Sequence, residues 1–322
     1  MGDVVHTLPA VTDAVAAVPD LRIDWVVEKA FADIPRMHPG VAHVLPIEFR
    51  RWRRRPLAHR ADFSAFRQDL RRREYDLVLD AQGLFKSTLI ASLARGPVTG
   101  FDRSSARESL AALAYRHGIA VRRDLHAIER QRMLFAGALG YRAPRGAIDY
   151  GLKRATGSGR KILLLHGTTW PTKHWPEAYW ARLVEMVRAD GYEPLIPAGN
   201  DAERHRAVEM LGAGSGQILD GLGLEDLAGR MSDCAGAVSV DTGLGHLSAA
   251  LDLPMVSLFG PTNPVLTRPI GQRQTVLNAQ GLSCIPCMKR DCLFAAGTAP
   301  WPPCLAQLEP ARVWQALREQ IE

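Results

Sequence analysis

Residues Asp241, Thr242, Gly243 and His246 have the types and spacing of a phosphate-binding loop. Small and β-branched residues at 235–240 precede them and apolar residues at helical spacing follow, which predicts a strand, a tight turn and a helix. The first N–H groups of a helix lack partners within the helix and lie at the positive end of its dipole, so they favour phosphate. The alternative is an ordinary connection capped by Thr242. His246 favours the phosphate site, because a polar imidazole beside leucines is not a side chain that core packing would require.

Other loops of the second half carry residues suited to the same chemistry. Two of them, each after a predicted strand, contain Thr168, Thr169 and Lys173, and Gly260-Pro261-Thr262. Since the carboxyl ends of parallel strands open on one edge of a sheet, the three loops together predict one phosphate site. No Gly-x-Gly-x-x-Gly or Walker loop follows a strand, which disfavours dinucleotide and P-loop enzymes. Glu203, after another strand end, either accepts hydrogen bonds from ribose hydroxyls or faces solvent.

The first half carries a strongly basic segment, with ten arginines between Arg50 and Arg73. The sequence around Trp52 predicts that several guanidinium groups crowd one indole, and such density costs repulsion unless an anion is near. The residues concerned are Arg50, Arg51, Arg53, Arg54 and Arg55. An acidic ligand is therefore favoured over a plain solvated helix face. No aromatic platform or recognition module accompanies the arginines, which disfavours nucleic acid as the partner.

Arg107 is a further candidate for anion binding. The sequence predicts a helix that starts at Ser104, which places Arg107 in its first turn. A cation there opposes the helix dipole, so we expect Arg107 to be held for an anion rather than for stability.

Four cysteines form a separate group near the end of the chain, at positions Cys284, Cys287, Cys292 and Cys304. Their spacing matches no standard zinc module. They either hold a metal or take a redox role, or they are reduced structural thiols, as expected in a reducing compartment. Cys234 is expected in the core.

Length and composition describe a folded protein of about two domains. The chain has 322 residues, of which 47% are hydrophobic and 23% charged, and a net charge of +6 that favours an acidic partner. No run approaches the ~20 apolar residues of a membrane span and no segment resembles a signal peptide, so we expect the protein in the cytoplasm.

Strand and helix patterns alternate in both halves of the chain, which predicts an α/β protein with two Rossmann-like domains whose parallel sheets face each other across a cleft. The polar, Gly-rich segment 151–160 is the expected boundary, giving domains 1–150 and 151–322. The chain opens on a predicted helix at 3–17 with no strand before it. We therefore expect the first domain to lack its first strand.

Motifs spread over nearly the whole chain resemble the bacterial heptosyltransferases of lipopolysaccharide core assembly, glycosyltransferase family 9. They include Met1-Gly2-Asp3-Val4-Val5-His6, Asp80-Ala81-Gln82-Gly83, Ala106-Arg107-Glu108, Lys173-His174-Trp175-Pro176 and Asp241-Thr242-Gly243-Leu244-Gly245-His246. The resemblance implies a GT-B fold whose first domain binds the acceptor and whose second binds the ADP-sugar. It implies inverting transfer of L-glycero-D-manno-heptose from ADP-heptose to the first Kdo of Kdo2-lipid A, without a metal or other cofactor.

The resemblance also implies roles for individual residues. Asp3 corresponds to the general base that takes the proton of the Kdo hydroxyl. The donor-binding residues would be Thr168, Thr169, Lys173, Glu203, Asp241, Thr242, Gly243 and His246, and the acceptor-binding residues Arg50, Arg51, Arg53, Arg54 and Arg107. The basic first domain would also dock on the anionic lipid of the cytoplasmic face of the inner membrane.

Two related functions remain open at this point. The cysteine group is more reminiscent of the family members that add a second heptose, whose acceptor already bears one. A sugar-nucleotide 2-epimerase shares the two-domain architecture, and it would release free sugar from the donor alone.

Overall fold

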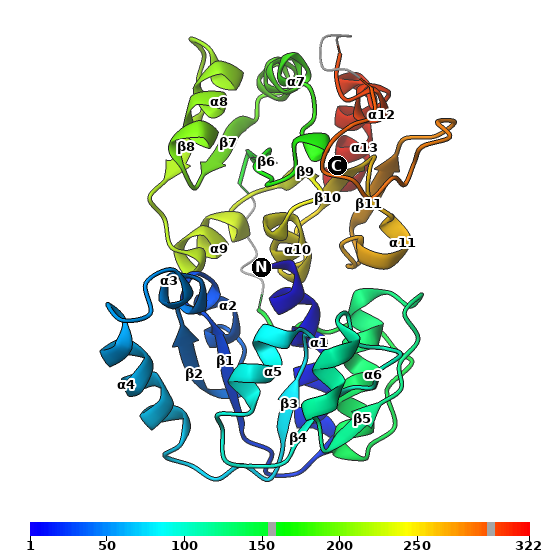
Figure 1. The fold of residues 1–322 in the computed structure, drawn as a ribbon. Helices are drawn as coiled ribbons and strands as arrows, with labels where there is room; N and C mark the ends of the chain where they lie inside the picture. Colours follow the sequence, from blue (N-terminus) through cyan, green and yellow to red (C-terminus); the bar gives the residue numbers. More distant parts are fainter. Residues whose placement is uncertain (154–158, 295–299) are drawn as a thin grey trace. The chain divides into compact units, whose positions relative to one another are not determined.

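The computed structural model describes residues 1–153, 159–294 and 300–322. The chain divides into two compact units, residues 3–152 and 153–322, and each is an α/β unit (Figure 1). The predicted linker 151–160 includes 154–158, which lie outside the described residues. Within these ranges no helix is long and apolar enough to cross a membrane.

The first unit alternates helices with short parallel strands. Its elements are α1 (Gly2–Ala17), β1 (Ile23–Glu28), η1 (Lys29–Phe31), α2 (Asp33–Arg36), β2 (Val41–Ile47), α3 (Phe49–Arg54), α4 (Arg60–Leu70), β3 (Val78–Asp80), α5 (Phe85–Ala91), β4 (Val98–Phe101), η2 (Ser109–Ala114), β5 (His117–Ile119) and α6 (Ala127–Leu139). The helix predicted at 3–17 is confirmed, and the apolar pattern of residues 127–139, which predicts a second helix, is confirmed as α6. The second ends at Gly140, whose φ of 75° is the left-handed conformation that closes helices and favours glycine.

The strands of this unit form two separate parallel sheets, β1–β2 and β3–β4–β5. Among the described residues, β1 and β3 each pair on one edge alone. Helix α1 joins the sheets by side-chain packing, because its buried Val11 and Ala14 cluster with Trp25 of β1 and Leu79 of β3. The amino-terminal helix is therefore part of the core that holds the two sheets together.

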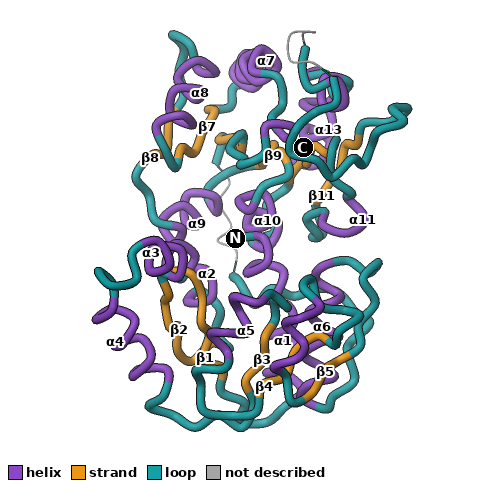
Figure 2. Tube along the Cα trace, in the orientation of Figure 1, coloured by secondary structure: helices purple, strands orange, loops and turns teal. Residues whose placement is uncertain are grey.

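The second unit contains one six-stranded parallel sheet in the order β11-β10-β9-β6-β7-β8. Its strands are drawn in orange in Figure 2. Its elements are β6 (Lys161–Leu165), η3 (Pro171–Lys173), α7 (Glu177–Ala189), β7 (Glu193–Ala198), α8 (Asp201–Leu211), β8 (Gln217–Asp220), α9 (Leu224–Ser232), β9 (Gly236–Val240), α10 (Gly243–Ala250), β10 (Met255–Phe259), α11 (Pro264–Thr267), β11 (Gln274–Asn278), α12 (Pro303–Ala306) and α13 (Pro310–Ile321). The alternation of strands and helices expected for this half of the chain is confirmed up to β10.

Helices cover the sheet of the second unit. Strands β9 and β10 are buried along their whole length, as near-continuous apolar runs in parallel sheets require. Trp175 and Trp180 pack edge to face at 4.9 Å, and the indole N–H of Trp175 donates to the Leu308 carbonyl at 2.9 Å. Helix α13 closes the core through Trp314, whose N–H donates to Asp190 of the turn after α7.

The helix predicted from Ser104 is wrong. Residues 104–107 form a turn, and the next helical segment is the short η2. Asp102 explains the difference, because its side chain accepts hydrogen bonds from the Ser104 hydroxyl and the Ser105 N–H, both at 2.8 Å. A short carboxylate that bonds the next backbone N–H groups competes with helix formation. The residue pattern at 75–80 predicts a longer strand than β3, and no local pattern predicts β5, β11 or α13.

Candidate functional site

In the second unit, loops after three neighbouring strands converge on the carboxylate of Asp241. Lys173 places its Nζ 2.7 Å from Asp241 Oδ2, and the Thr262 hydroxyl donates to the same oxygen at 2.7 Å. His246 Nε2 lies 4.0 Å from the other oxygen. The three loops meet because β6, β9 and β10 are adjacent in the sheet. Asp241 is buried, so this carboxylate holds a cation and a hydroxyl at the carboxyl edge of the sheet.

Helix α10 starts at this carboxylate. Thr242 is its N-cap, but the Thr242 side chain makes no capping hydrogen bond, so the interpretation of Thr242 as an ordinary cap is wrong. Gly245 lets the helix approach β9 closely, because a Cβ there would lie 2.5 Å from the Ser239 hydroxyl. His246 is buried beside Asp241, which explains why an imidazole occurs among leucines.

Thr168, Thr169 and Glu203 lie on neighbouring loops of the same unit. Both threonines are in the segment between β6 and η3, with Thr169 exposed. Glu203 is half-buried in the first turn of α8, and its carboxylate accepts from the Gly199 N–H at 2.8 Å. Its own N–H donates to Asn200, so Glu203 takes part in capping the helix. The carboxylate is directed at the loop after β7, and its hydrogen bonding to ribose hydroxyls stays a prediction.

In the first unit, Asp3 and Arg107 form a two-pronged ion pair. Arg107 donates from Nη2 to Asp3 Oδ1 at 2.7 Å and from Nη1 to Oδ2 at 3.1 Å. Burial alone would raise the pKa of Asp3, but the guanidinium of Arg107 outweighs it, so the pKa of this carboxyl is below its usual value. Arg107 is in a turn and not in a helix. Its anion in this structure is Asp3.

The ion pair borders a pocket that contains about 370 Å³ of space, part of it open to solvent. Among its lining residues are His6 of α1, Gln82 after β3, and Arg130 and Gln131 of α6. Two buried polar atoms there have no hydrogen-bond partner among the described residues, Arg130 Nε and Gln131 Oε1. No local motif predicts these residues as site residues, because they come from separate parts of the chain.

Asp80 holds the loop that forms one wall of this pocket. Its buried carboxylate accepts from the N–H groups of Gln82 and Gly83 at 2.9 and 3.2 Å, and from three hydroxyls, those of Ser87, Thr88 and Tyr115, at 2.8 to 3.0 Å. The Gly83 carbonyl in turn accepts from the Glu108 N–H at 3.0 Å, next to Arg107. Asp80 therefore fixes the segment against which the Arg107 turn packs.

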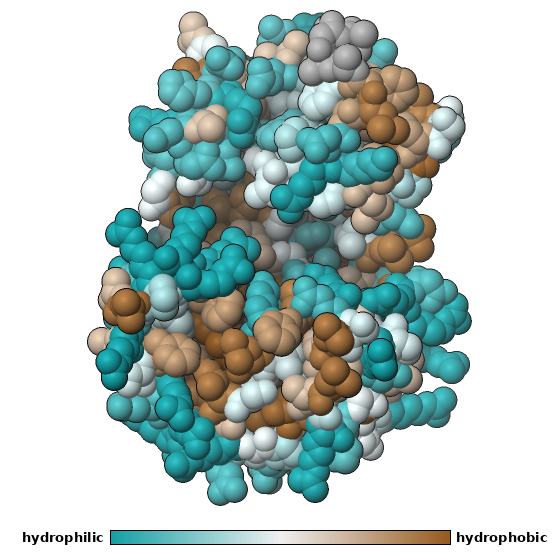
Figure 3. All heavy atoms as spheres, in the orientation of Figure 1, coloured by the Kyte–Doolittle hydropathy of each residue, from teal (hydrophilic) through white to brown (hydrophobic). Residues whose placement is uncertain are grey.

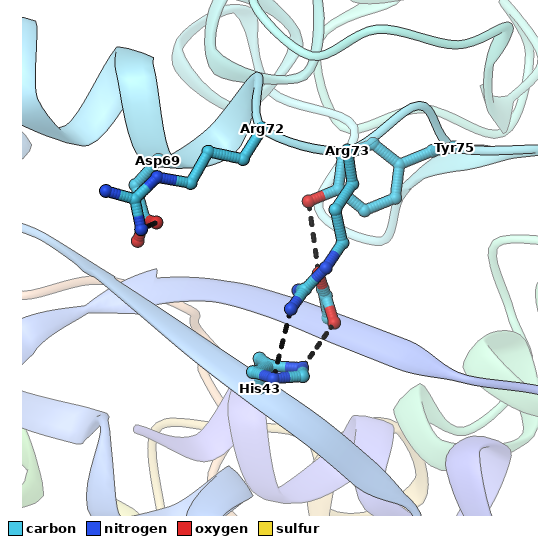
Figure 4. Close-up of polar contacts among 6 residues, drawn as sticks. His43, Asp69, Arg72, Arg73 and Tyr75 are labelled. Atoms are coloured by element: carbon cyan, nitrogen blue, oxygen red, sulfur yellow. Dashed lines mark hydrogen bonds and ion pairs between the residues drawn. The ribbon is translucent and has the colours of Figure 1, made fainter.

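The arginine-rich segment divides into a structural end and an exposed end. At its carboxyl end, Arg73 binds Asp24 of β1 at 2.6 Å, and the same carboxylate accepts from Tyr75 and contacts His43, both at 3.1 Å (Figure 4). Arg72 pairs with Asp69. Arg73 therefore attaches the segment to the β1–β2 sheet, whereas Arg72 pairs within its own segment.

The exposed end is α3, where Arg50, Arg51, Arg53 and Arg54 point outward and form part of a hydrophilic area (Figure 3). The expectation that the guanidinium groups crowd the Trp52 indole is wrong. Trp52 is buried and packs against Phe63 and Phe66 with ring centroids 5.7 and 5.6 Å apart. Because helix α3 is amphipathic, the indole takes the core face and the arginines take the other.

All five cysteines are free thiols. Cys284, Cys287, Cys292 and Cys304 line one mainly apolar pocket together with Leu293 and Phe294. Burial is the main cause that raises the pKa of Cys304 to about 11. In the described ranges no three His, Cys, Asp or Glu side chains are grouped so that they could hold a metal ion. Cys234 is buried in the core, as expected.

Comparison with known proteins agrees with this architecture. Residues 63–296 match the family model of glycosyltransferase family 9 (heptosyltransferase). The chain is 44% identical over 339 aligned positions to lipopolysaccharide heptosyltransferase 1 of Pseudomonas aeruginosa, covering 100% of this chain and 95% of that protein. Its structure is similar to that of E. coli heptosyltransferase WaaC with ADP, with a TM-score of 0.87, 38% identity and 99% and 96% of the two chains covered. WaaC with ADP-2-deoxy-2-fluoro heptose matches over the same shares with a TM-score of 0.84.

Two α/β units with parallel sheets, matched along their length by WaaC, define a glycosyltransferase of the GT-B fold. The chain belongs to glycosyltransferase family 9, the heptosyltransferases, and it acts in lipopolysaccharide inner-core synthesis.

Proposed function

We propose that this enzyme transfers L-glycero-D-manno-heptose from ADP-heptose to the first Kdo of Kdo2-lipid A, with inversion at the anomeric carbon. The observation that carries the proposal is the 44% identity with a lipopolysaccharide heptosyltransferase 1 along the whole chain. The match to structures that contain ADP and an ADP-heptose analogue supports the donor. The first unit binds the acceptor and the second unit binds the donor.

In the reaction, an acceptor hydroxyl gives its proton to the carboxylate of Asp3. The hydroxyl oxygen forms a bond to the anomeric carbon of the heptose, while the bond from that carbon to the β-phosphate oxygen of ADP breaks. The electron pair of this bond stays on the phosphate, and ADP leaves. A carboxylate within reach of the hydroxyl supplies the general base that this step needs.

The donor residues act by holding the phosphates. Lys173 and the start of α10 at Thr242 and Gly243 present a cation and unpaired N–H groups at the carboxyl edge of the sheet. Preorganised positive charge stabilises the ADP leaving group as its charge develops. Thr168, Thr169 and Glu203 complete the donor site from the neighbouring loops, with Asp241 and His246 orienting Lys173.

The acceptor residues lie on the first unit and face a lipid surface. The exposed arginines of α3 attract anionic headgroups and acceptor phosphates. Four exposed apolar side chains occur on α5 and η2, an area in which apolar atoms are visible in Figure 3: Phe85, Leu89, Leu110 and Leu113. This combination of cations and apolar side chains suits peripheral association with the cytoplasmic face of the inner membrane.

The test is transfer of labelled heptose from ADP-heptose in the presence of EDTA, with Kdo2-lipid A and its monoheptosylated form offered separately. We expect product with Kdo2-lipid A, and we expect Asp3→Ala to abolish transfer while ADP-heptose binding is nearly unchanged. Product with the heptosylated acceptor alone would identify a second-heptose enzyme instead. Release of free heptose without any acceptor would favour an epimerase.

A further inference from the structure

Four of the five cysteines gather at one place in the second unit, and the proposed transfer reaction gives them no role. Cys284, Cys287 and Cys292 lie in the segment after β11, and Cys304 lies in α12. All four are free thiols and line one pocket that contains about 360 Å³ of space, part of it open to solvent. Thiols that share a pocket can react with each other through a small disulfide.

Cys304 is the fixed thiol of this group. It is buried beside Leu305 of the core, and its Sγ lies 2.7 Å from the position that a Cβ on Gly260 would take. The thiol therefore packs on the backbone that leads from β10 to Thr262, a partner of Asp241. Burial is the main cause that raises its pKa, so Cys304 stays protonated near neutral pH and attacks a disulfide slowly.

The other three thiols belong to residues 284–292, which we call the cysteine segment. This segment is hydrogen-bonded to two loops of the proposed donor site. The Lys289 carbonyl accepts from the Thr172 hydroxyl at 2.8 Å, and the Met288 N–H donates to the Pro261 carbonyl at 2.8 Å. The cysteine segment therefore holds the loop after β6 and the loop after β10.

A ring contact also links the cysteine segment to Lys173. The guanidinium of Arg290 lies over the Trp170 ring, 5.4 Å from its centroid, and the ammonium of Lys173 lies over the same ring at 4.6 Å. Contacts of a cation with an aromatic ring are worth about 0.5–1 kcal/mol at exposed sites. A movement of Arg290 would therefore remove one support of the ring against which Lys173 lies.

We propose that Cys292 and Cys304 form a reversible disulfide, and that its closure draws the cysteine segment away from Trp170 and Thr172 and so weakens ADP binding. The oxidant is a low-molecular-weight disulfide such as oxidised glutathione. The effect on ADP rests on the proposed function, in which Lys173 holds the donor phosphates, whereas formation of the disulfide does not depend on it.

The reaction is a balanced thiol–disulfide exchange. The Cys292 sulfur bonds to one sulfur of the small disulfide, whose other sulfur leaves as a thiol. The Cys304 sulfur then bonds to the Cys292 sulfur and releases the second small thiol. The two leaving sulfurs take up the two protein thiol protons, and two electrons pass from the cysteines to the small disulfide.

Two observations favour this pair and this order of attack. Cys292 is half-buried and Cys304 is buried, so Cys292 is the thiol that a small disulfide reaches first. Among the thiols that act on the pKa of Cys304, Cys292 is the stronger and Cys287 the weaker, which places Cys292 close to Cys304. Cys292 is therefore the attacking thiol and Cys304 the resolving thiol.

Closure of the disulfide moves the cysteine segment and not α12. The bond requires the two Cβ atoms to lie about 3.5–4.5 Å apart. Because the core holds Cys304, Cys292 makes the approach, into the space of the pocket. Lys289 and Arg290 lie just before Cys292 in the chain and follow it. The hydrogen bond to Thr172 and the contact with Trp170 are then lost or weakened.

Peptide mapping tests the disulfide, because trypsin separates the two pairs of cysteines. Cys284 and Cys287 fall in peptide 274–289, and Cys292 and Cys304 fall in peptide 291–312. The native enzyme is equilibrated with oxidised glutathione, unfolded in the presence of N-ethylmaleimide, digested and weighed. We expect both cysteines of peptide 274–289 to be labelled and neither cysteine of peptide 291–312. Full labelling of both peptides, or glutathione retained on peptide 291–312, would overturn the proposed pair.

Hydrogen exchange of residues 170–176 without nucleotide tests the coupling to the loop after β6. We expect faster exchange in the oxidised enzyme than in the reduced one, and the Kd for ADP, measured by calorimetry, should rise about tenfold. Dithiothreitol should reverse both effects. Unchanged exchange in an enzyme that has formed the disulfide would overturn the coupling. Faster exchange with an unchanged Kd would confirm the coupling and instead contradict the donor role of Lys173.

Two serine variants show which thiol is responsible. Cys292→Ser removes the attacking thiol, so its exchange and its Kd for ADP should be the same with and without oxidised glutathione. Cys284→Ser is the matched control, because Cys284 lines the same pocket from the same segment. It should respond to the oxidant as the native enzyme does. A response that persists in Cys292→Ser and disappears in Cys284→Ser would show that another pair forms.

Discussion

Asp241 is the residue that organises the proposed donor site. It is buried, and its partners Lys173, Thr262 and His246 come from loops after three strands. A buried carboxylate needs such partners, because an unpaired charge in the interior is strongly destabilising. In the proposed donor site, the positive charge available to the ADP phosphates is therefore that of Lys173 reduced by the negative charge of Asp241.

Lys173→Ala is expected to weaken ADP binding more than the loss of one cation would suggest. The change removes a phosphate partner and also exposes the negative charge of Asp241 to the ligand. We expect the Kd for ADP to rise by about 10- to 100-fold, measured by titration calorimetry. Lys29→Ala, which removes an exposed lysine of the first unit, should bind ADP normally. An unchanged Kd for Lys173→Ala would remove Lys173 from the donor site.

Sequence reasoning succeeds at the residue scale where the site residues lie in short motifs. Lys173 and Asp241 follow predicted strands, and the parallel order of a sheet implies that their loops meet. The pair between Asp3 and Arg107 joins positions 104 residues apart, and no local pattern encodes it. No local pattern predicts the ion pair of Arg73 either, because its partner Asp24 lies far away in the sequence, on strand β1.

At the scale of elements, Asp80 shows how one side chain can fix a loop and the start of a helix. We expect Asp80→Ala to lower the free energy of unfolding of the first unit by about 3 kcal/mol, because several buried donors lose their acceptor. That corresponds to a fall in Tm of roughly 6–12 °C. Ser87→Ala, which removes one of these bonds, should cost about 1 kcal/mol. Equal Tm values for Asp80→Ala and the native enzyme in calorimetry would contradict this role.

His166, at the end of β6, predicts a pH dependence of stability. Burial and then the charge of Arg206 lower its pKa to about 4, while Glu203 opposes the shift and His174 adds to it. Between about pH 6.5 and 4 the unfolded chain binds a proton that the folded chain excludes, so stability falls as the pH falls through this range. The loss reaches about 3 kcal/mol at pH 4, from 1.36 kcal/mol for each unit of pKa shift.

Urea unfolding at pH 7.5 and 4.5 measures this effect. His166→Gln should lose less stability between the two pH values than the native enzyme, and the remainder includes a contribution from His174, whose pKa burial also lowers. His205→Gln changes an exposed histidine of α8 and should behave like the native enzyme. If His166→Gln and the native enzyme lost equal stability, His166 would not be the group responsible.

Elements with strong periodicity were predicted well, and those shaped by tertiary contacts were not. Sharp apolar patterns with clear ends predict a strand at 255–259 and a helix at 127–139, and β10 and α6 confirm these bounds. Strand β5 has three residues and little burial, so only its pairing with β4 makes it a strand. The helix expected from Ser104 does not form, because the Asp102 side chain accepts a hydrogen bond from the following backbone and so competes with helix formation.

At the scale of the whole molecule, net charge and its placement govern association with lipid. The net charge is +6, and the arginines of α3 are exposed. We expect the triple variant Arg50→Gln, Arg53→Gln, Arg54→Gln to bind anionic vesicles about 100-fold more weakly at low salt, at about 1 kcal/mol for each cation. The measurement is co-sedimentation with vesicles that contain phosphatidylglycerol.

A second triple variant changes the net charge by the same amount at other positions. It tests whether vesicle binding depends on where the arginines lie or on net charge alone. Arg122, Arg182 and Arg312 are exposed at scattered positions. Their replacement by glutamine should reduce vesicle binding far less than the α3 variant does. Equal losses in the two variants would show that net charge alone drives binding and that α3 has no special part in it.

The division of the chain followed from its repeated strand and helix pattern, but the internal layout of the first unit did not. Local patterns give the strands, whereas their grouping into two sheets depends on which edges find partners. Helix α1 was predicted as a helix, yet its position between β1 and β3 is a property of packing. Sheet order and helix placement are therefore the parts that sequence reasoning could not supply.

The convergence of three loops on Asp241 also constrains which substitutions this protein and its relatives can accumulate. Positions 173, 241 and 262 are far apart in the chain but share one oxygen atom. A change at one of them alters what the other two must satisfy, so their effects are not additive. Lys173→Ala combined with Asp241→Asn should therefore be milder than Lys173→Ala alone in ADP binding. Among related proteins these positions should change together or not at all.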